Sequence, residues 1–236
     1  GSLLSAALAC GTSFCGTSGY TNNITTQSEV DALAGCTDFF GTLIIDGQNQ
    51  TSGTNIITNL DSLINLQTVE SELKIKNFQS HHLSSLSLNN LNSAYNIELD
   101  QLKIDSILFP SLSTVNNSIV IKECWSIDSV NFEALTNVDG ITFYINGGWN
   151  GQTDGNFSLH TFNALNSLQS LQIDQNDRWN AGLEKLGGFN SISSIANLNV
   201  TANGLMNDCC VLLNLGAAAN SVSISGNGSN CGSLLS

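Results

Sequence analysis

Short apolar triplets recur along the whole chain, and they limit the folds that it can adopt. Each triplet has apolar residues at its first and third positions, the period of two that a β-strand with one buried face requires. Successive triplets lie roughly 22 to 30 residues apart, which is within the range of leucine-rich repeats and too far for hairpins. The triplets are residues 43–45, 73–75, 97–99, 119–121, 141–143, 171–173, 198–200 and 222–224.

A second regularity follows these expected strands. Three residues beyond the third position of most later triplets stands an Asn or a Cys, as at the N/C position of the leucine-rich pattern. An inward Asn can satisfy backbone groups where the chain bends, and a small thiol also fits there. We therefore assign a structural bend role, rather than a reactive or metal-binding role for the thiol, to Cys124, Asn146, Asn176, Asn203 and Asn227.

These two regularities predict a parallel β-solenoid of the leucine-rich-repeat kind with about eight coils. We expect one solenoid domain over residues 10–231. Its N-terminal cap would span 10–40, its central coils 41–204, and its C-terminal cap and last strand 205–231.

The chain begins and ends with the same five residues, GSLLS. One interpretation is a cloning scar combined with chance in a chain rich in Ser and Leu. The other is a junction between units of a longer array. We therefore treat residues 1–9 and 232–236 as linkers or inter-unit junctions and keep both interpretations open.

Six of the seven cysteines lie near the two ends, three at each, which predicts disulfides that staple terminal caps. Near the start, TTQSEVDALAGC predicts a short helix that Thr26 or Ser28 caps and Gly35 stops. Cys15 and Cys36 bracket this stretch and are expected to bond. Near the end, MNDCCVLLNL predicts a short apolar helix or coil. Cys209 or Cys210 would pair with Cys231, and the remaining one would bond elsewhere, with Cys10 as the candidate partner within the chain or in a neighbour.

Six Asn-X-Ser/Thr sequons offer candidate glycosylation sites, although a chain rich in Asn and Ser also produces sequons by chance. Together with the cysteines they favour an extracellular or cell-surface location. The sequons start at Asn23, Asn49, Asn116, Asn156, Asn199 and Asn227.

Three stretches carry a family resemblance. The opening ITTQSEVDALAGCTDFFGTLIIDG resembles that of receptor L-domain-like proteins, including fungal cell-wall proteins of the Ecm33/Sps2 kind, and ILFPSLSTVNNSIVI is similar to their internal repeat. The ending NDCCVLLNLGAAANSVSISGNGSNC resembles the C-terminal caps of surface leucine-rich proteins of Bacteroidota. The resemblance implies a receptor L-domain-like fold and an extracellular protein with a cell-wall, adhesive or ligand-binding role and no catalysis.

Charge and motifs argue against several other functions. The formal net charge of −13, with six basic side chains, disfavours nucleic acid and anionic membrane surfaces as partners. No apolar stretch is long enough to span a bilayer. The pair His81–His82, expected in a loop, lacks the spacing of a metal site, and scattered acids such as Asp100 and Asp174 are expected to be solvated loop charges. We expect no enzyme activity, metal or cofactor.

The favoured function is a non-catalytic extracellular structural or adhesive protein, or the repeating unit of a surface filament or tandem array. Its partners would then be further copies or tandem neighbours. The alternative is a ligand-binding module of the receptor L-domain type that recognises a glycan or a protein, with Trp149 and Trp179 as contact-surface candidates. A carbohydrate-active solenoid enzyme ranks third.

Overall fold

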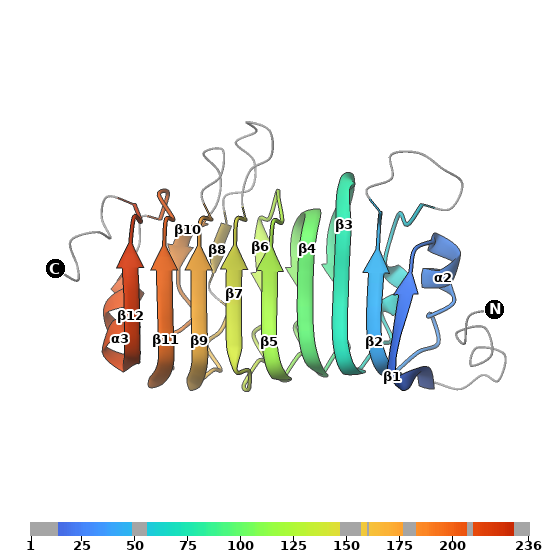
Figure 1. The fold of residues 1–236 in the computed structure, drawn as a ribbon, viewed down its shortest axis with the longest axis horizontal. Helices are drawn as coiled ribbons and strands as arrows, with labels where there is room; N and C mark the ends of the chain where they lie inside the picture. Colours follow the sequence, from blue (N-terminus) through green and yellow to red (C-terminus); the bar gives the residue numbers. More distant parts are fainter. Residues whose placement is uncertain are drawn as a thin grey trace.

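The computed structural model describes residues 14–48, 56–146, 157–159, 161–176, 183–206 and 210–228. They form an elongated parallel β-solenoid of about seven turns, whose strands lie side by side along the molecule (Figure 1). All of the predicted triplets lie in strands of one sheet. The expected count of eight coils is not confirmed, since the solenoid has about seven turns.

The main sheet has ten strands, and nine of them follow the order β1-β2-β3-β4-β5-β7-β9-β11-β12, while β6 pairs with β4. Every pairing is parallel, as expected when each coil returns the chain to the same edge. The strands are β1 (Phe14–Ile24), β2 (Asp38–Asp46), β3 (Thr68–Ser87), β4 (Ser93–Leu108), β5 (Thr114–Lys122), β6 (Ser129–Asn131), β7 (Gly140–Tyr144), β9 (Ser167–Asp174), β11 (Ser194–Thr201) and β12 (Ala219–Ser225).

A second, shorter run of strands forms the opposite side of the coil. The long strands β3 and β4 continue past the bend into this side, where β4 pairs with β6. Further along, β8 (Phe157–Leu159) pairs with β10 (Leu183–Leu186) in a two-stranded sheet. The prediction of a loop around NFQSHHLSSL is therefore wrong, because this segment lies within β3.

The core lies between the two sides of the coil. Inward residues of each triplet form continuous rows across the sheet, such as Leu73, Ile97 and Ile119, none of which is exposed. At the turn that precedes the main sheet, four Phe side chains form a row of ring contacts from coil to coil, the first edge-to-face and the next two stacked. Their ring centroids lie 5.4, 5.5 and 4.9 Å apart along the series Phe109, Phe132, Phe162 and Phe189.

Short helices lie at both ends of the described solenoid. Thr26 caps α2 (Gln27–Asp31), and Glu29 completes a capping box. The helix ends before Gly35, with Ala32 as its C-cap. The short helix η1 (Asp61–Leu63) packs beside α2, and α3 (Cys210–Ala218) precedes β12, as the apolar ending of the sequence predicts.

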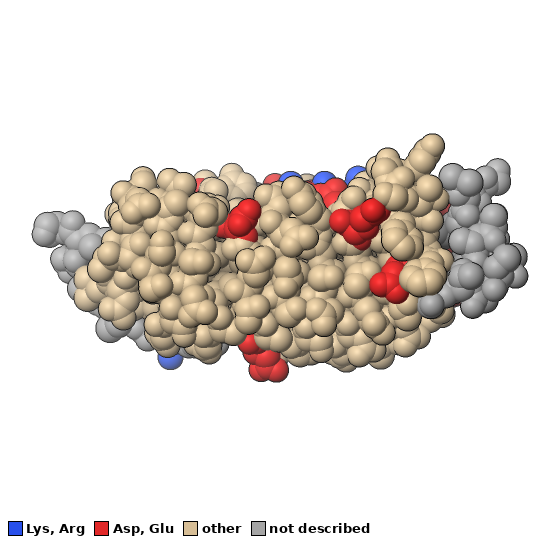
Figure 2. All heavy atoms as spheres, turned by 90° about the horizontal axis from the view of Figure 1, so that it is seen from below, with Lys and Arg blue, Asp and Glu red and all other residues tan. Residues whose placement is uncertain are grey.

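Charged side chains are sparse on the side of the molecule where the strands begin. Figure 2 shows this side as almost entirely uncharged, with a few acidic groups, while basic groups gather mostly along the upper rim. In the underlying turns, neutral residues link successive coils through the backbone: Asn92 N donates to Gln67 O at 2.8 Å, and Ser113 N donates to Asn92 O at 2.9 Å. Asn, Ser, Thr and Gln therefore supply most of the polar surface here.

Candidate functional site

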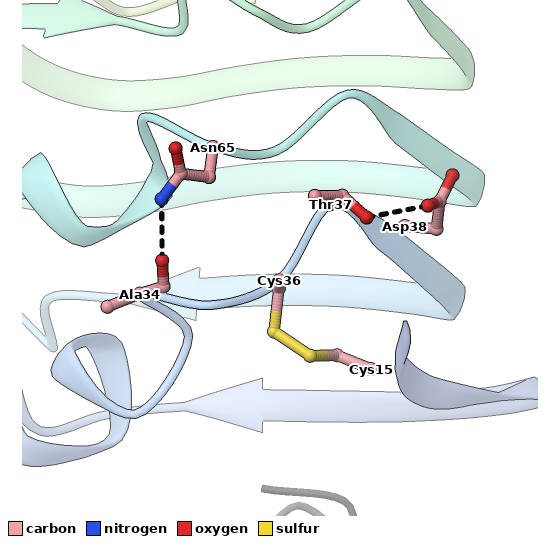
Figure 3. The surroundings of a disulfide bond; sticks show 6 residues. All are labelled: Cys15, Ala34, Cys36, Thr37, Asp38 and Asn65. Atoms are coloured by element: carbon pink, nitrogen blue, oxygen red, sulfur yellow. Dashed lines mark hydrogen bonds between the residues drawn. A yellow bond between two sulfur atoms is a disulfide. The ribbon is translucent and has the colours of Figure 1, made fainter. Parts of the chain in front are cut away.

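The N-terminal cap is held by a disulfide between Cys15 and Cys36, which confirms the predicted bond. It joins the start of β1 to the segment that leads into β2, with Cα atoms 5.8 Å apart (Figure 3). Nearby, the Asn65 side chain donates to the backbone oxygen of Ala34 at 2.8 Å. The disulfide thus staples the cap internally, and the Asn65 hydrogen bond ties the cap to the following coil.

Four asparagines at the bend form a hydrogen-bonded ladder that we call the asparagine ladder: Asn146, Asn176, Asn203 and Asn227. Each side-chain oxygen accepts from the backbone N–H of the bend residue one coil earlier, at 2.9 to 3.1 Å. Each side-chain nitrogen donates to a backbone carbonyl of an earlier strand, as Asn146 Nδ2 does to Ile121 O at 2.8 Å. The ladder pairs backbone groups that the bend would otherwise leave buried without partners.

Cys124 occupies the same bend position at the start of the asparagine ladder. Its backbone N–H donates to Asn146 Oδ1 at 2.9 Å, and its thiol contacts the Lys122 carbonyl oxygen at 3.3 Å. Burial raises the pKa of the Cys124 thiol to about 12. The side chain is therefore a neutral, weak hydrogen-bond donor that fits the bend and has little thiolate character.

A cluster of ion pairs covers the outward face of β2 to β5. Lys74 and Lys122 both reach Glu98 Oε1, at 2.9 and 3.0 Å, and Lys122 also lies 3.4 Å from Asp100. On the neighbouring strands Lys76 pairs with Asp46 at 3.0 Å. We expected Asp100 to be a solvated charge in a loop. It lies instead on the outward face of β4, within this cluster.

The pKa values in the ion-pair cluster follow from burial and from the lysines. Burial raises the pKa of the Glu98 carboxyl, but the hydrogen bonds and charges of Lys74 and Lys122 outweigh it and hold the pKa below its ordinary value. Burial also raises the pKa of Asp100, which stays raised despite Lys122. The lysines are thus already paired with carboxylates, so this face offers no concentrated positive charge to an anion.

Four exposed aromatic side chains lie on β1, β2 and β4, and we call them the aromatic platform: Phe14, Tyr20, Phe40 and Tyr95. They are 55, 61, 39 and 49 % exposed. The rings of Phe14 and Phe40 have centroids 5.9 Å apart. Phe14 and Phe40 lie where β1 and β2 pair in continuous register, whereas Tyr20 and Tyr95 lie at bulges where the register shifts. Sequence reasoning missed this surface.

A glutamate on β3 fixes the bulge that carries Tyr20. The Glu70 carboxylate accepts from Ser18 Oγ at 2.7 Å and from the backbone N–H of Gly41 at 2.8 Å. Gly41 has a φ of +83°, and a Cβ there would lie 2.3 Å from the carbonyl oxygen of Tyr20. The bulge therefore packs directly on Gly41, which needs both the positive φ and the missing side chain.

The two terminal strands of the main sheet carry no charged residue. Both β1 and β12 stand at the ends of the strand order, so the described strands pair with them on one edge only. In β12, Val222 continues the inward row of Leu198 but is 44 % exposed. Natural sheets usually protect such edges with charges, Pro or a cover.

The candidate glycosylation sites differ in accessibility. Asn23 and Asn116 are exposed, and Asn199 is partly exposed on the outward face of β11. At Asn227, Nδ2, the atom that a glycan would modify, donates to Val200 O at 2.7 Å within the asparagine ladder.

Several predicted site residues lie outside the described residues. The C-terminal disulfides and the tryptophan contact surface therefore stay predictions. Cys210 begins α3, but its side chain is likewise outside the description. The other residues concerned are Cys10, Cys209, Cys231, Asn49, Asn156, Trp149 and Trp179.

Among the described residues, no three or more His, Cys, Asp or Glu side chains come together in a group that could hold a metal ion. Among the same residues, no helix is long and apolar enough to cross a membrane.

The fold defines the class of this molecule as a parallel β-solenoid with a disulfide-held N-terminal cap. Comparisons of the chain with protein-family models, with curated proteins and with solved structures yield no match.

Proposed function

We propose that this protein is a non-catalytic extracellular structural or adhesive protein whose copies associate through the ends of the solenoid. The observation that carries the proposal is the pair of uncharged terminal strands, β1 and β12. All strands run parallel, so β12 of one copy can meet β1 of the next without a change in strand direction. Such a contact between two different surfaces does not close on itself, and it produces a filament or array.

The exposed apolar residues at the C-terminal end support this arrangement. Val222 and Leu213 are each 44 % exposed at the last described coil. A further coil stacked on β12 would bury Val222, as β12 itself helps to bury Leu198, which is only 2 % exposed. The gain in buried apolar surface would favour end-to-end contact.

We also propose that the solenoid belongs to the receptor L-domain-like or leucine-rich-repeat-like surface proteins. The asparagine ladder supports this, because its residues occupy the Asn position of the leucine-rich pattern. The Cys15–Cys36 bond supports an oxidising, extracellular setting. Exposed sequons at Asn23 and Asn116 are compatible with glycosylation in a host that performs it.

End-to-end assembly can be tested with one charged substitution. Electron microscopy and sedimentation velocity of the purified chain over a range of concentrations should reveal filaments with an axial repeat of about 40 to 60 Å, since nine stacked strands spaced about 4.8 Å apart span about 40 Å. Val222→Lys should abolish assembly, because it places a charge at the open edge. The matched control is Asn197→Lys, an exposed site on β11. Monomers at all concentrations, or unchanged filaments in Val222→Lys, would contradict the proposal.

A second function, a ligand-binding module that recognises a glycan or a protein, is favoured by the aromatic platform. Clustered exposed aromatics on a soluble protein commonly mark a binding surface. This function does not require assembly.

A further inference from the structure

We propose that the aromatic platform binds a neutral polysaccharide chain that runs across strands β1 to β4. The proposal rests on the second function above, and it chooses a glycan over a protein. It concerns Phe14, Tyr20, Phe40 and Tyr95, which none of our sequence predictions included.

The first argument is the kind of side chain that is exposed. Among the described residues, seven large apolar side chains are exposed, and the four aromatic ones all belong to the platform. Flat rings with few rotatable bonds lose little entropy on binding, and they stack on the C–H faces of sugar rings.

The second argument is the spacing of the rings. Val69 is in register with Phe39 on one side and with Ala94 on the other, so the residues that follow them, Phe40 and Tyr95, stand two strands apart. Two strand spacings amount to about 9.5 Å, which is comparable to the length of two linked sugar units. A linear polymer that runs perpendicular to the strands could therefore contact both Phe40 and Tyr95 with sugar units of the same chain.

The third argument is charge. Glu70 stands between Phe40 and Tyr95, and its carboxylate is already held by Ser18 and Gly41. The chain has a net charge of −13, which disfavours polyanions such as nucleic acid or sulfated glycans. Neutral hydroxyl and amide side chains on the same face, such as Thr42 and Asn96, supply the hydrogen-bonding groups that sugar hydroxyls require.

The bulge on β1 places the backbone of Tyr20 against Gly41, the residue that follows Phe40. Its anchor is the contact of Gly41 with the backbone of Tyr20 and the two hydrogen bonds of Glu70. Because these contacts fix the bulge, they hold the Tyr20 backbone in place before a ligand arrives. Such preorganisation lowers the entropic cost of binding.

The test is affinity electrophoresis of the full chain through gels that contain soluble β-glucan, mannan or glycol chitin, with heparin as the anionic control. The polysaccharide that retards the chain would then supply an oligosaccharide for titration calorimetry. Tyr20→Ala combined with Tyr95→Ala should weaken its binding at least about tenfold. Tyr20→Phe combined with Tyr95→Phe should retain binding, because the rings remain.

Ile64→Ala is the matched control, since Ile64 is 48 % exposed but lies outside the platform. It should leave affinity unchanged, and circular dichroism should show that every variant is folded. The proposal is overturned if none of the neutral polysaccharides retards the chain, if heparin alone does so, or if the double alanine variant binds as tightly as the wild type. If instead a protein partner binds through the platform and no glycan does, the binding-module function survives and the glycan assignment fails.

Discussion

The side-chain oxygen of Asn176 accepts two hydrogen bonds from Asn146, one from its backbone N–H at 3.0 Å and one from Nδ2 at 2.9 Å. The side-chain nitrogen of Asn176 donates in turn to the carbonyl oxygens of Phe143 and Asp174, both at 3.0 Å. One amide group thus connects two coils and pairs the buried polar groups of both. The stability of the bend depends on these hydrogen bonds.

Asn176→Ala should destabilise the fold by about 3 kcal/mol or more, because it leaves several buried donors and acceptors without partners. Asn197→Ala, at an exposed site on the same sheet, should change stability by less than about 0.5 kcal/mol. Urea denaturation followed by circular dichroism would measure both. Equal midpoints for the two variants would show that the ladder contributes nothing to stability.

The Cys124 thiol should react slowly with iodoacetamide in the folded chain at pH 8, since it is buried and burial raises its pKa to about 12. The same thiol should react rapidly in denaturant. Peptide mapping by mass spectrometry separates it from the other cysteines. Rapid native labelling of Cys124 would mean that the bend is open to solvent.

Glu98→Gln should lower the melting temperature at neutral pH but have little effect in acid. The pKa of Glu98 is held below its ordinary value of 4.5, so its stabilising contribution is complete above that pH and is lost as the pH falls through the lower folded value. The melting curves of variant and wild type should therefore converge on acidification. The control is Glu133→Gln, at an exposed site outside the cluster; a variant difference that persists at pH 2 would contradict the argument.

Removal of the Cys15–Cys36 bond should cost about 3 kcal/mol, since the bond closes a loop with a sequence separation of 21. The double substitution Cys15→Ser with Cys36→Ser avoids an unpaired thiol. Thermal unfolding gives the size of the loss, and hydrogen exchange should locate the added opening in β1 and α2. Uniform loss of protection over all coils would show instead that the cap and the coils unfold as one unit.

The repeating part of the fold could be predicted from sequence because it is periodic. Alternating apolar residues such as Leu73 and Ile75 identify strands wherever one face is buried. The four stacked Phe residues also left a signal, since each begins a Phe-x-x-Leu or Phe-x-x-Ile pattern, as in Phe109 to Leu112. Strand β1 gave almost no such signal in the sequence, because Asn22 occupies the inward position that Leu43 fills in β2.

The aromatic platform could not be predicted, because it depends on bulges and register rather than on a local pattern. Tyr20 and Tyr95 are far apart in the sequence, and each lies next to a register shift in its strand. A bulge breaks the period of two, so the outward direction of these side chains cannot be counted from the triplet. The hydrogen bonds of Glu70 that fix one bulge are likewise long-range contacts.

The stacking of all main strands in one direction has a mechanical consequence. Each coil is bonded only to its two neighbours, and the backbone hydrogen bonds of the sheet lie along the length of the stack. A pulling force applied to the two ends would act along these bonds and would open one coil at a time. The molecule would therefore yield gradually under tension, lengthening coil by coil from its ends rather than failing in a single event.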